Sequence, residues 1–160
     1  MAAGSRDISS VMVAAAICLL AVSCSQGGDF YEFQDTDPHN GGVYGFNVPF
    51  TDSGAVYETF LACRFNSLPE GTASIPLILT AVSPSGEIAQ ETLALPLDGE
   101  RTGSLEWPYR SNVSPAGDTG VWYLSLTVPS ADISRHVLGM GFRSRRCDSD
   151  KSIPKDEFEE

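Results

Sequence analysis

The fold is decided by the stretch Ala55-Val56-Tyr57-Glu58-Thr59-Phe60-Leu61-Ala62-Cys63-Arg64-Phe65-Asn66. Every second residue in it is apolar or small, namely Tyr57, Thr59, Leu61, Cys63 and Phe65. Glu58 and Arg64 fall on the opposite side. Because successive side chains of a strand point to opposite faces, this period of two predicts a half-buried β-strand.

Similar strand signals lie on both sides of this stretch, separated by residues that favour turns. They fall at 30–33, 44–50, 74–82, 87–97, 104–110, 120–128 and 136–145. Ser83-Pro84-Ser85-Gly86 predicts a tight hairpin between two of them. No helical period of useful length follows the first 24 residues. Seven to nine short strands therefore predict an all-β chain folded as an antiparallel β-sandwich, with jelly-roll and immunoglobulin-like strand orders both open.

Three details add to this expectation. Residues 75–79 are apolar on both faces, as in a central strand that is covered on both sides. Trp122 is expected in the core, on the inward face of its strand. Leu138-Gly139-Met140-Gly141-Phe142 alternates large apolar residues with glycine, which predicts one face of large side chains in the last strand.

The amino-terminal residues indicate export. Residues 11–22 form an unbroken apolar run of twelve residues behind Arg6. A helix of that length rises roughly 18 Å, short of the ~30 Å hydrocarbon core of a bilayer, and suits a signal peptide better than a membrane span. The run closes with Leu20-Ala21-Val22-Ser23-Cys24, which resembles a bacterial lipoprotein cleavage site. A secretory leader that merely contains a cysteine is the alternative.

Four segments follow from this interpretation: a lipoprotein signal peptide at 1–23, a lipidated Cys24 with its tether at 24–29, a β-sandwich at 30–147 and an acidic disordered tail at 148–160. Two or three acyl chains on Cys24 would hold the protein stably at a membrane, since two or more chains are needed for stable anchoring.

The net charge of −11 limits the partners. Phosphate contacts require Lys and Arg, so a chain this acidic is not expected to bind nucleic acid. The cluster Arg143, Arg145 and Arg146 is the one basic feature, and we expect it at a solvated strand end facing the acidic tail.

After removal of Cys18 with the leader and acylation of Cys24, two cysteines remain, Cys63 and Cys147. In an oxidising compartment they could form a disulfide. The alternative is two unpaired thiols, with Cys63 as a small buried residue and Cys147 at a strand edge. Without a CxxC pair, and with only His39 and His136, no metal site and no cofactor are expected.

The order of features resembles the gliding-motility-associated lipoproteins of the GldH type, found in Bacteroidetes. The resemblance is carried by Cys24, the aromatic segment 30–33, the stretch 57–66, Ser83-Pro84-Ser85-Gly86-Glu87, Gly120-Val121-Trp122-Tyr123 and 138–143. It implies a periplasmic or outer-membrane lipoprotein. It also implies contact with other envelope lipoproteins or with motility and secretion proteins, and no enzymatic activity.

Catalytic patterns are missing from the sequence, which has no G-x-S-x-G elbow and no phosphate-binding glycine loop. We therefore expect no catalytic residues. The rival hypothesis is a lipid-anchored carbohydrate-binding module. Trp107 and Tyr109 are two residues apart and would point the same way, so they could form a platform for sugar rings or pack in the core.

Overall fold

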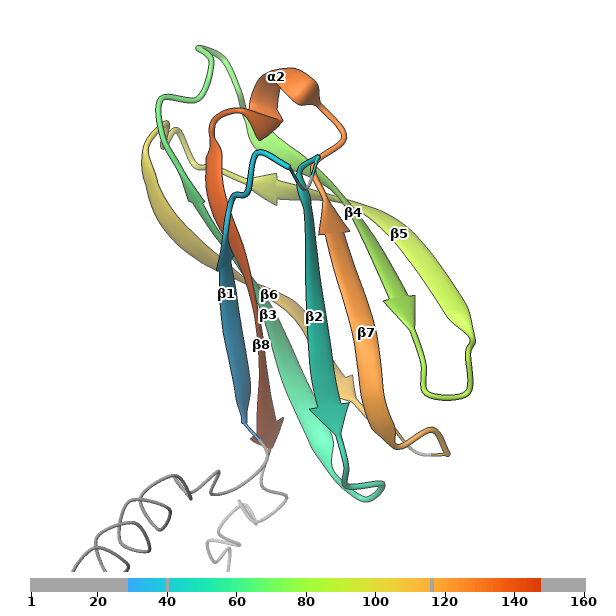
Figure 1. Cartoon of the computed structure of the whole chain (residues 1–160). Helices are drawn as coiled ribbons and strands as arrows, with labels where there is room; N and C mark the ends of the chain where they lie inside the picture. Colours follow the sequence, from blue (N-terminus) through green and yellow to red (C-terminus); the bar gives the residue numbers. More distant parts are fainter. Residues whose placement is uncertain (1–28, 40, 116, 148–160) are drawn as a thin grey trace, which may run out of the picture.

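The computed structural model describes residues 29–39, 41–115 and 117–147. This part of the chain forms strands joined by short connections, with one single-turn helix (Figure 1). The elements are β1 (Phe30–Asp35), β2 (Val43–Phe50), β3 (Val56–Phe65), β4 (Ser74–Val82), β5 (Ile88–Pro96), β6 (Gly103–Val113), β7 (Gly120–Thr127), α2 (Ala131–Ser134) and β8 (Val137–Cys147).

The strands make two antiparallel sheets of four. Sheet A has the order β1-β8-β3-β6, and sheet B has the order β2-β7-β4-β5. The prediction of an all-β antiparallel sandwich is confirmed.

The strand order is that of a jelly roll. The first strand pairs with the last, and the pairing continues toward the middle of the sequence: β1 with β8, β2 with β7, β3 with β6 and β4 with β5. This nesting arises when one long hairpin of four strand pairs rolls up and divides between two sheets. An immunoglobulin order would place its strands differently, so the structure decides between the two orders left open by the sequence.

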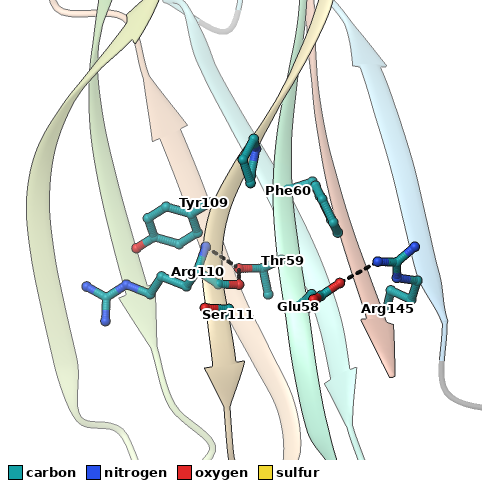
Figure 2. A pocket seen from close by; sticks show the side chains of 8 residues that line it. Glu58, Thr59, Phe60, Tyr109, Arg110, Ser111 and Arg145 are labelled. Atoms are coloured by element: carbon teal, nitrogen blue, oxygen red, sulfur yellow. Dashed lines mark hydrogen bonds and ion pairs between the residues drawn. The ribbon is translucent and has the colours of Figure 1, made fainter. Parts of the chain in front are cut away.

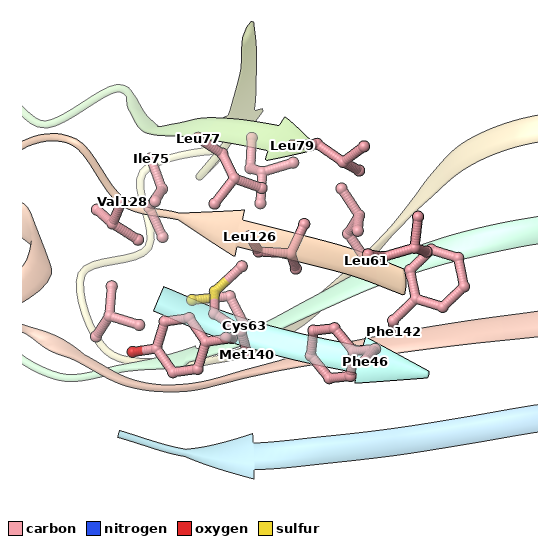
Figure 3. Packing of buried hydrophobic residues seen from close by; sticks show 14 of the residues in the cluster. Phe46, Leu61, Cys63, Ile75, Leu77, Leu79, Leu126, Val128, Met140 and Phe142 are labelled. Atoms are coloured by element: carbon pink, nitrogen blue, oxygen red, sulfur yellow. The ribbon is translucent and has the colours of Figure 1, made fainter. Parts of the chain in front are cut away.

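The core lies between the sheets and follows the period-two pattern. On β3 the predicted face is buried throughout, with Tyr57 and Leu61 each 1% exposed and Thr59 3% exposed. Figure 3 shows Leu61 and Cys63 of β3 among side chains from the other sheet. Trp122 is half-buried and packs against this core, at its edge rather than at its centre.

One expected alternation fails in β8. Met140 and Phe142 are buried, but Leu138 is 41% exposed. The ladder with β3 pairs Met140 with Cys63 and then Val137 with Phe65, so one extra residue lies in β8 at this point. Such a β-bulge reverses the alternation. Val137 therefore takes the inward position that the sequence predicted for Leu138.

The sequence also predicted that both faces of residues 75–79 are covered, and this prediction is wrong for the single chain. β4 lies between β5 and β7, and its inward residues Ile75, Leu77 and Leu79 are buried. Its outward residues Pro76 and Ile78 are only half-buried, because no element of the described chain lies over the outer face of sheet B.

Both ends of the domain lie at one end of the sandwich. β1 begins and β8 ends there, which we call the terminal end (Figure 1). The connections from β2 to β3, from β4 to β5 and from β6 to β7 lie at the same end. Because all pairings are antiparallel, β1, β3, β5 and β7 run away from the terminal end and β2, β4, β6 and β8 run toward it.

Candidate functional site

A cleft opens between the sheets where edge strands β5 and β6 face each other, toward the terminal end. We call it the inter-sheet cleft. Its volume of about 430 Å³ is within the range of small-molecule sites. Apolar side chains from both sheets line it, among them Phe50, Leu79, Trp122, Leu124 and Phe142.

Trp122 belongs to an aromatic wall of this cleft. Its ring meets that of Phe50 edge to face, with 6.3 Å between centroids. Its indole N–H donates to the carbonyl oxygen of Asp118 at 3.0 Å. Since the only polar atom of the indole is satisfied by the protein, the part of Trp122 that lines the cleft is apolar.

The rim of the cleft is polar. The Tyr109 hydroxyl donates to the carboxylate of Glu91, and the Arg110 guanidinium binds both oxygens of that carboxylate at 3.1 and 3.2 Å. The guanidinium also lies over the Tyr109 ring, 5.4 Å from its centroid. Because Glu91 is on β5 and the other two residues are on β6, these contacts join the two sheets at the mouth. Asn112 lies on the same rim, with a left-handed φ of 58°.

Trp107 and Tyr109 share a face of β6, as the sequence predicted, but this face turns toward sheet B and both side chains are half-buried against the core. The indole N–H of Trp107 donates to the carbonyl oxygen of Pro96 at 2.8 Å. Trp107 thereby bridges β6 and β5 beyond the cleft, and only Tyr109 lines it. The pair forms no outward platform.

A second hollow of about 400 Å³ lies on the outside of sheet A (Figure 2). Phe60 is in its lining, with the Arg143 guanidinium 4.2 Å from the ring centroid and the Arg145 guanidinium 5.6 Å from it. Arg143 pairs with Glu106 at 2.5 Å, and Arg145 pairs with Glu58. The carboxylate of Glu58 also raises the pKa of the Arg145 guanidinium.

The basic cluster is therefore held by carboxylates within the domain, since the third member, Arg146, pairs with Asp52 at 2.9 Å. The expected partner, the acidic tail, lies outside the described residues. Within residues 29–147 as described, each arginine side chain has an acidic or carbonyl partner.

The possible disulfide between Cys63 and Cys147 is not present in the structure, where both residues are free thiols. Cys147 pairs across the ladder with Val56, seven residues along β3 from Cys63. At ~3.3 Å per residue the two lie roughly 23 Å apart, far beyond the ~7 Å that a disulfide spans. Cys63 is fully buried, and burial raises the pKa of its thiol to about 12.

Among the described residues, no group of three or more His, Cys, Asp or Glu side chains could hold a metal ion. His39 lies in the first connection, where its backbone N–H donates to the Asp37 carboxylate at 2.8 Å. His136 lies beside the backbone carbonyl of Asn66, with Nδ1 3.2 Å from the oxygen. The two histidines thus belong to different connections.

The lipidation site Cys24, the signal peptide at 1–23, most of the tether and the tail at 148–160 lie outside the described residues. Within the described residues, no helix has the length and apolar character needed to cross a membrane.

Comparison with known proteins gives no family. No protein-family model and no curated protein matches the chain. Among solved structures, an arabinose-bound α-L-arabinofuranosidase is similar at a TM-score of 0.37 and 15% identity, over 71% of this chain and 19% of that enzyme. The tomato aspermy virus structure gives a TM-score of 0.26 at 13% identity, over 91% of this chain and 98% of that one. The tobacco streak virus coat protein gives 0.29 at 5% identity, over 84% and 97%. Likenesses this distant carry no argument about function.

Proposed function

We propose that the protein is a non-catalytic lipoprotein, held in the cell envelope by acyl chains on Cys24. The observation that carries the proposal is the sequence that ends in Cys24 and stands six residues before β1. Phe30 is six residues after Cys24, and at ~3.5 Å per residue this segment spans at most ~21 Å. A lipid at Cys24 would therefore hold the terminal end of the sandwich close to the membrane.

We further propose that it is a component of gliding-motility or protein-secretion-associated envelope machinery, on the periplasmic side of the outer membrane. The support is the resemblance to the GldH-type lipoproteins. Of its signals, 57–66 and 138–143 fall on the paired strands β3 and β8. Ser83-Pro84-Ser85-Gly86-Glu87 and the start of β7 fall at the terminal end. Asp118 connects these last two signals: its carboxylate accepts from the Ser85 hydroxyl at 2.7 Å, and its backbone carbonyl accepts from the Trp122 indole N–H at 3.0 Å.

The test is the mass of the mature amino terminus, together with complementation of a deletion strain. Cells that produce the wild-type chain should yield a mature protein starting at acylated Cys24. The deletion strain should lose surface spreading or secretion, and the wild-type gene should restore it. Cys24→Ala should leave an unprocessed, unacylated chain that restores neither. An unacylated product released into the medium, or turnover of any small molecule, would contradict the proposal.

A second candidate function is carbohydrate binding, because the inter-sheet cleft combines aromatic faces with a polar rim. Trp122 and Tyr109 supply apolar faces for a sugar ring, and Glu91, Arg110 and Asn112 supply hydrogen-bonding groups. Calorimetric titration with neutral oligosaccharides tests it. Binding that is lost in Arg110→Ala and kept in Arg64→Ala, which changes an arginine on the outside of sheet A, would favour this function. If no oligosaccharide gives a measurable heat of binding, carbohydrate binding is excluded as the function.

A further inference from the structure

The outer face of sheet B carries no charged side chain. Along β2, β4, β5 and β7 the outward positions hold only apolar, hydroxyl, amide and glycine residues, and Glu91, on the inward side, is the single charged residue in the four strands. We call this surface the uncharged face. The outer side of sheet A is the opposite, with the ion pairs of Arg64, Arg143 and Arg145. In a chain of net charge −11, such a division between the sheets points to a partner for the uncharged face.

The uncharged face also exposes large apolar side chains. Ile88 is 72% exposed, Val121 56%, Tyr123 45% and Val43 38%. These are four of the six large apolar residues exposed in the described part of the chain. The ladders place Ile88 beside Val82 and Val82 beside Tyr123, so an apolar row crosses β5, β4 and β7. Exposed apolar surface of this kind marks interaction sites.

The pattern of β4 gives a second, independent indication. Residues 75–79 have the two-sided apolar character of a strand covered on both faces, and the single chain covers one of them. Ile78 thus lies on the outer face of β4, where the apolar sequence of the strand predicts burial but no other part of the described chain covers it.

One large side chain of this face lies flat on the sheet. Tyr123 lies across Gly45 of the neighbouring strand, so that a Cβ at residue 45 would come within 2.5 Å of the tyrosine oxygen. A glycine beneath the ring lets it lie down on the sheet instead of projecting from it. A sheet face on which a large ring lies flat can pack closely against another sheet.

We propose that the uncharged face packs against the same face of a second copy of this chain. Burial of a charged side chain against it would leave that charge without a counter-ion, so the opposing surface must also be uncharged. The uncharged face itself meets this condition. Its use by two copies is a self-complementary, two-fold arrangement, the commonest in homo-oligomers.

The charged outer sides of the two A sheets stay far apart in this arrangement. With sheets stacked ~10 Å apart, the charged outer sides of the two A sheets lie roughly 30 Å from each other, several times the ~8 Å Debye length at physiological salt. Contact through sheet A would instead press its ion pairs against those of the second copy, and their charged side chains would lose hydration.

The area is sufficient. Four strands at ~4.8 Å spacing and about eight residues at ~3.3 Å give a face of roughly 500 Å². Two copies then bury ~1,000 Å² in total, which reaches the lower bound for a specific interface. A two-fold axis parallel to the strands also keeps both terminal ends on the same side, so that two copies anchored in one membrane can pair.

Cysteine cross-linking in intact cells tests the proposal on the full chain. In a Cys147→Ser background, which keeps the buried Cys63 and the acylated Cys24, one accessible cysteine is placed on the uncharged face as Thr80→Cys, Ser125→Cys or Thr127→Cys, and a short bis-maleimide is added. At least one position should give a product of twice the monomer mass. Ser104→Cys, exposed on the outer side of sheet A, is the matched control and should give none.

Charge on the uncharged face should prevent the pairing. Ser125→Arg and Tyr123→Asp each change an outward side chain and leave the core intact, and each should reduce the dimer product at least tenfold at an unchanged protein level. Protease resistance of the monomer confirms folding for both. The proposal is overturned by products of other masses only, by equal products at residue 104, or by none. The mass of the mature amino terminus in the same sample reports acylation separately, so loss of the anchor and loss of the dimer are distinguishable.

Discussion

At the residue scale, the glycines of β8 make room for Phe33. A Cβ at Gly139 would lie 2.5 Å from the Phe33 ring and 2.7 Å from a backbone oxygen, and a Cβ at Gly141 would lie 2.8 Å from the same ring. The guanidinium of Arg64 also lies over this ring, 5.2 Å from its centroid. The aromatic ring is thus in contact with a glycine backbone and with an arginine on the outside of sheet A.

We therefore expect Gly139→Ala to destabilise the fold by ~1–3 kcal/mol, because the methyl group overpacks against a ring and a backbone atom that cannot both move away. The midpoint of urea unfolding measures this. Gly54→Ala is the control, since a Cβ there meets only Asp52 at an ordinary 3.5 Å, and its midpoint should stay close to wild type. Equal midpoints for the two variants would contradict the packing of Phe33.

The buried thiol of Cys63 gives a second prediction, for alkaline pH. Its folded pKa of about 12 is above the unfolded value near 9, so its contribution to stability is fully present below pH 9. As the pH rises further, only the unfolded chain releases the proton. The free energy of unfolding should then fall by up to ~1.4 kcal/mol per pH unit. Burial also raises the pKa of Tyr44, which adds its own loss at higher pH.

Unfolding curves between about pH 8 and pH 10 for wild type and Cys63→Ala isolate the thiol. The substitution lowers stability at every pH but should remove most of the slope. A slope that persists unchanged in the variant would assign the effect to another group.

The alternation of residues predicts which side chains face the core. It does not predict which residues of two strands lie opposite each other. The alternation in residues 55–66 correctly predicted that Cys63 is buried. It could not show that Cys147 lies opposite Val56, because register is fixed by contacts between strands far apart in sequence. The exposure of Leu138 has the same origin, since an inserted residue is visible only once the partner strand is known.

At the element scale, an unusual bridge joins the two sheets on the side opposite the inter-sheet cleft. The Gln34 side chain of β1 donates to the carbonyl oxygen of Gly45 at 2.5 Å and accepts from the Gly45 N–H at 3.2 Å. One amide side chain thus pairs with the backbone of β2 as a neighbouring strand would. Thr36 adds a 2.7 Å contact with the Tyr44 hydroxyl just beyond β1.

We expect Gln34→Ala to cost ~1–3 kcal/mol, because it leaves the N–H and carbonyl of Gly45 without these partners in a half-buried place. Amide hydrogen exchange at Gly45 should accelerate more than exchange elsewhere in β2. Gln90→Ala removes a single exposed contact with Thr80 and should stay within ~0.5 kcal/mol of wild type. Similar losses in both variants would contradict the bridge.

Strand positions were readable from the sequence, whereas strand ends and order were not. β6 continues to Val113, three residues beyond its predicted end, through Asn112 in a left-handed conformation. The single turn α2 was missed, although Ser130 caps it by accepting from the N–H of Ile133. The nested order depends on β1 meeting β8, a contact between the two ends of the domain that no local pattern encodes.

At the scale of the whole molecule, the candidate cleft was only half readable. Tyr109 was singled out, but its expected companion Trp107 bridges to Pro96 instead, and Trp122 from the other sheet takes its place. Alternation assigns a side chain to a face. It does not say how far apart the sheets stand at that point, and this spacing decides whether an aromatic ring fills the core or lines an opening.

The segregation of charge predicts how association through the uncharged face responds to salt. An interface without ion pairs has nothing for salt to weaken, and screening reduces the repulsion between two chains of −11. The cross-linked yield of Ser125→Cys should stay constant or rise between about 50 mM and about 500 mM salt. A yield that falls steeply with salt would indicate a charged contact elsewhere.

The place of β8 in sheet A has a consequence for biosynthesis. Within residues 29–147 as described, β1 is the first strand and pairs in sheet A with β8, the last, and β8 lies between β1 and β3. Neither β1 nor β3 can complete its ladder with β8 until residues 137–147 have been synthesised. A product that stops before Val137 leaves a gap in the middle of a sheet, with two strand edges open to degradation. The arrangement therefore acts as a built-in check that the domain has been synthesised to its end.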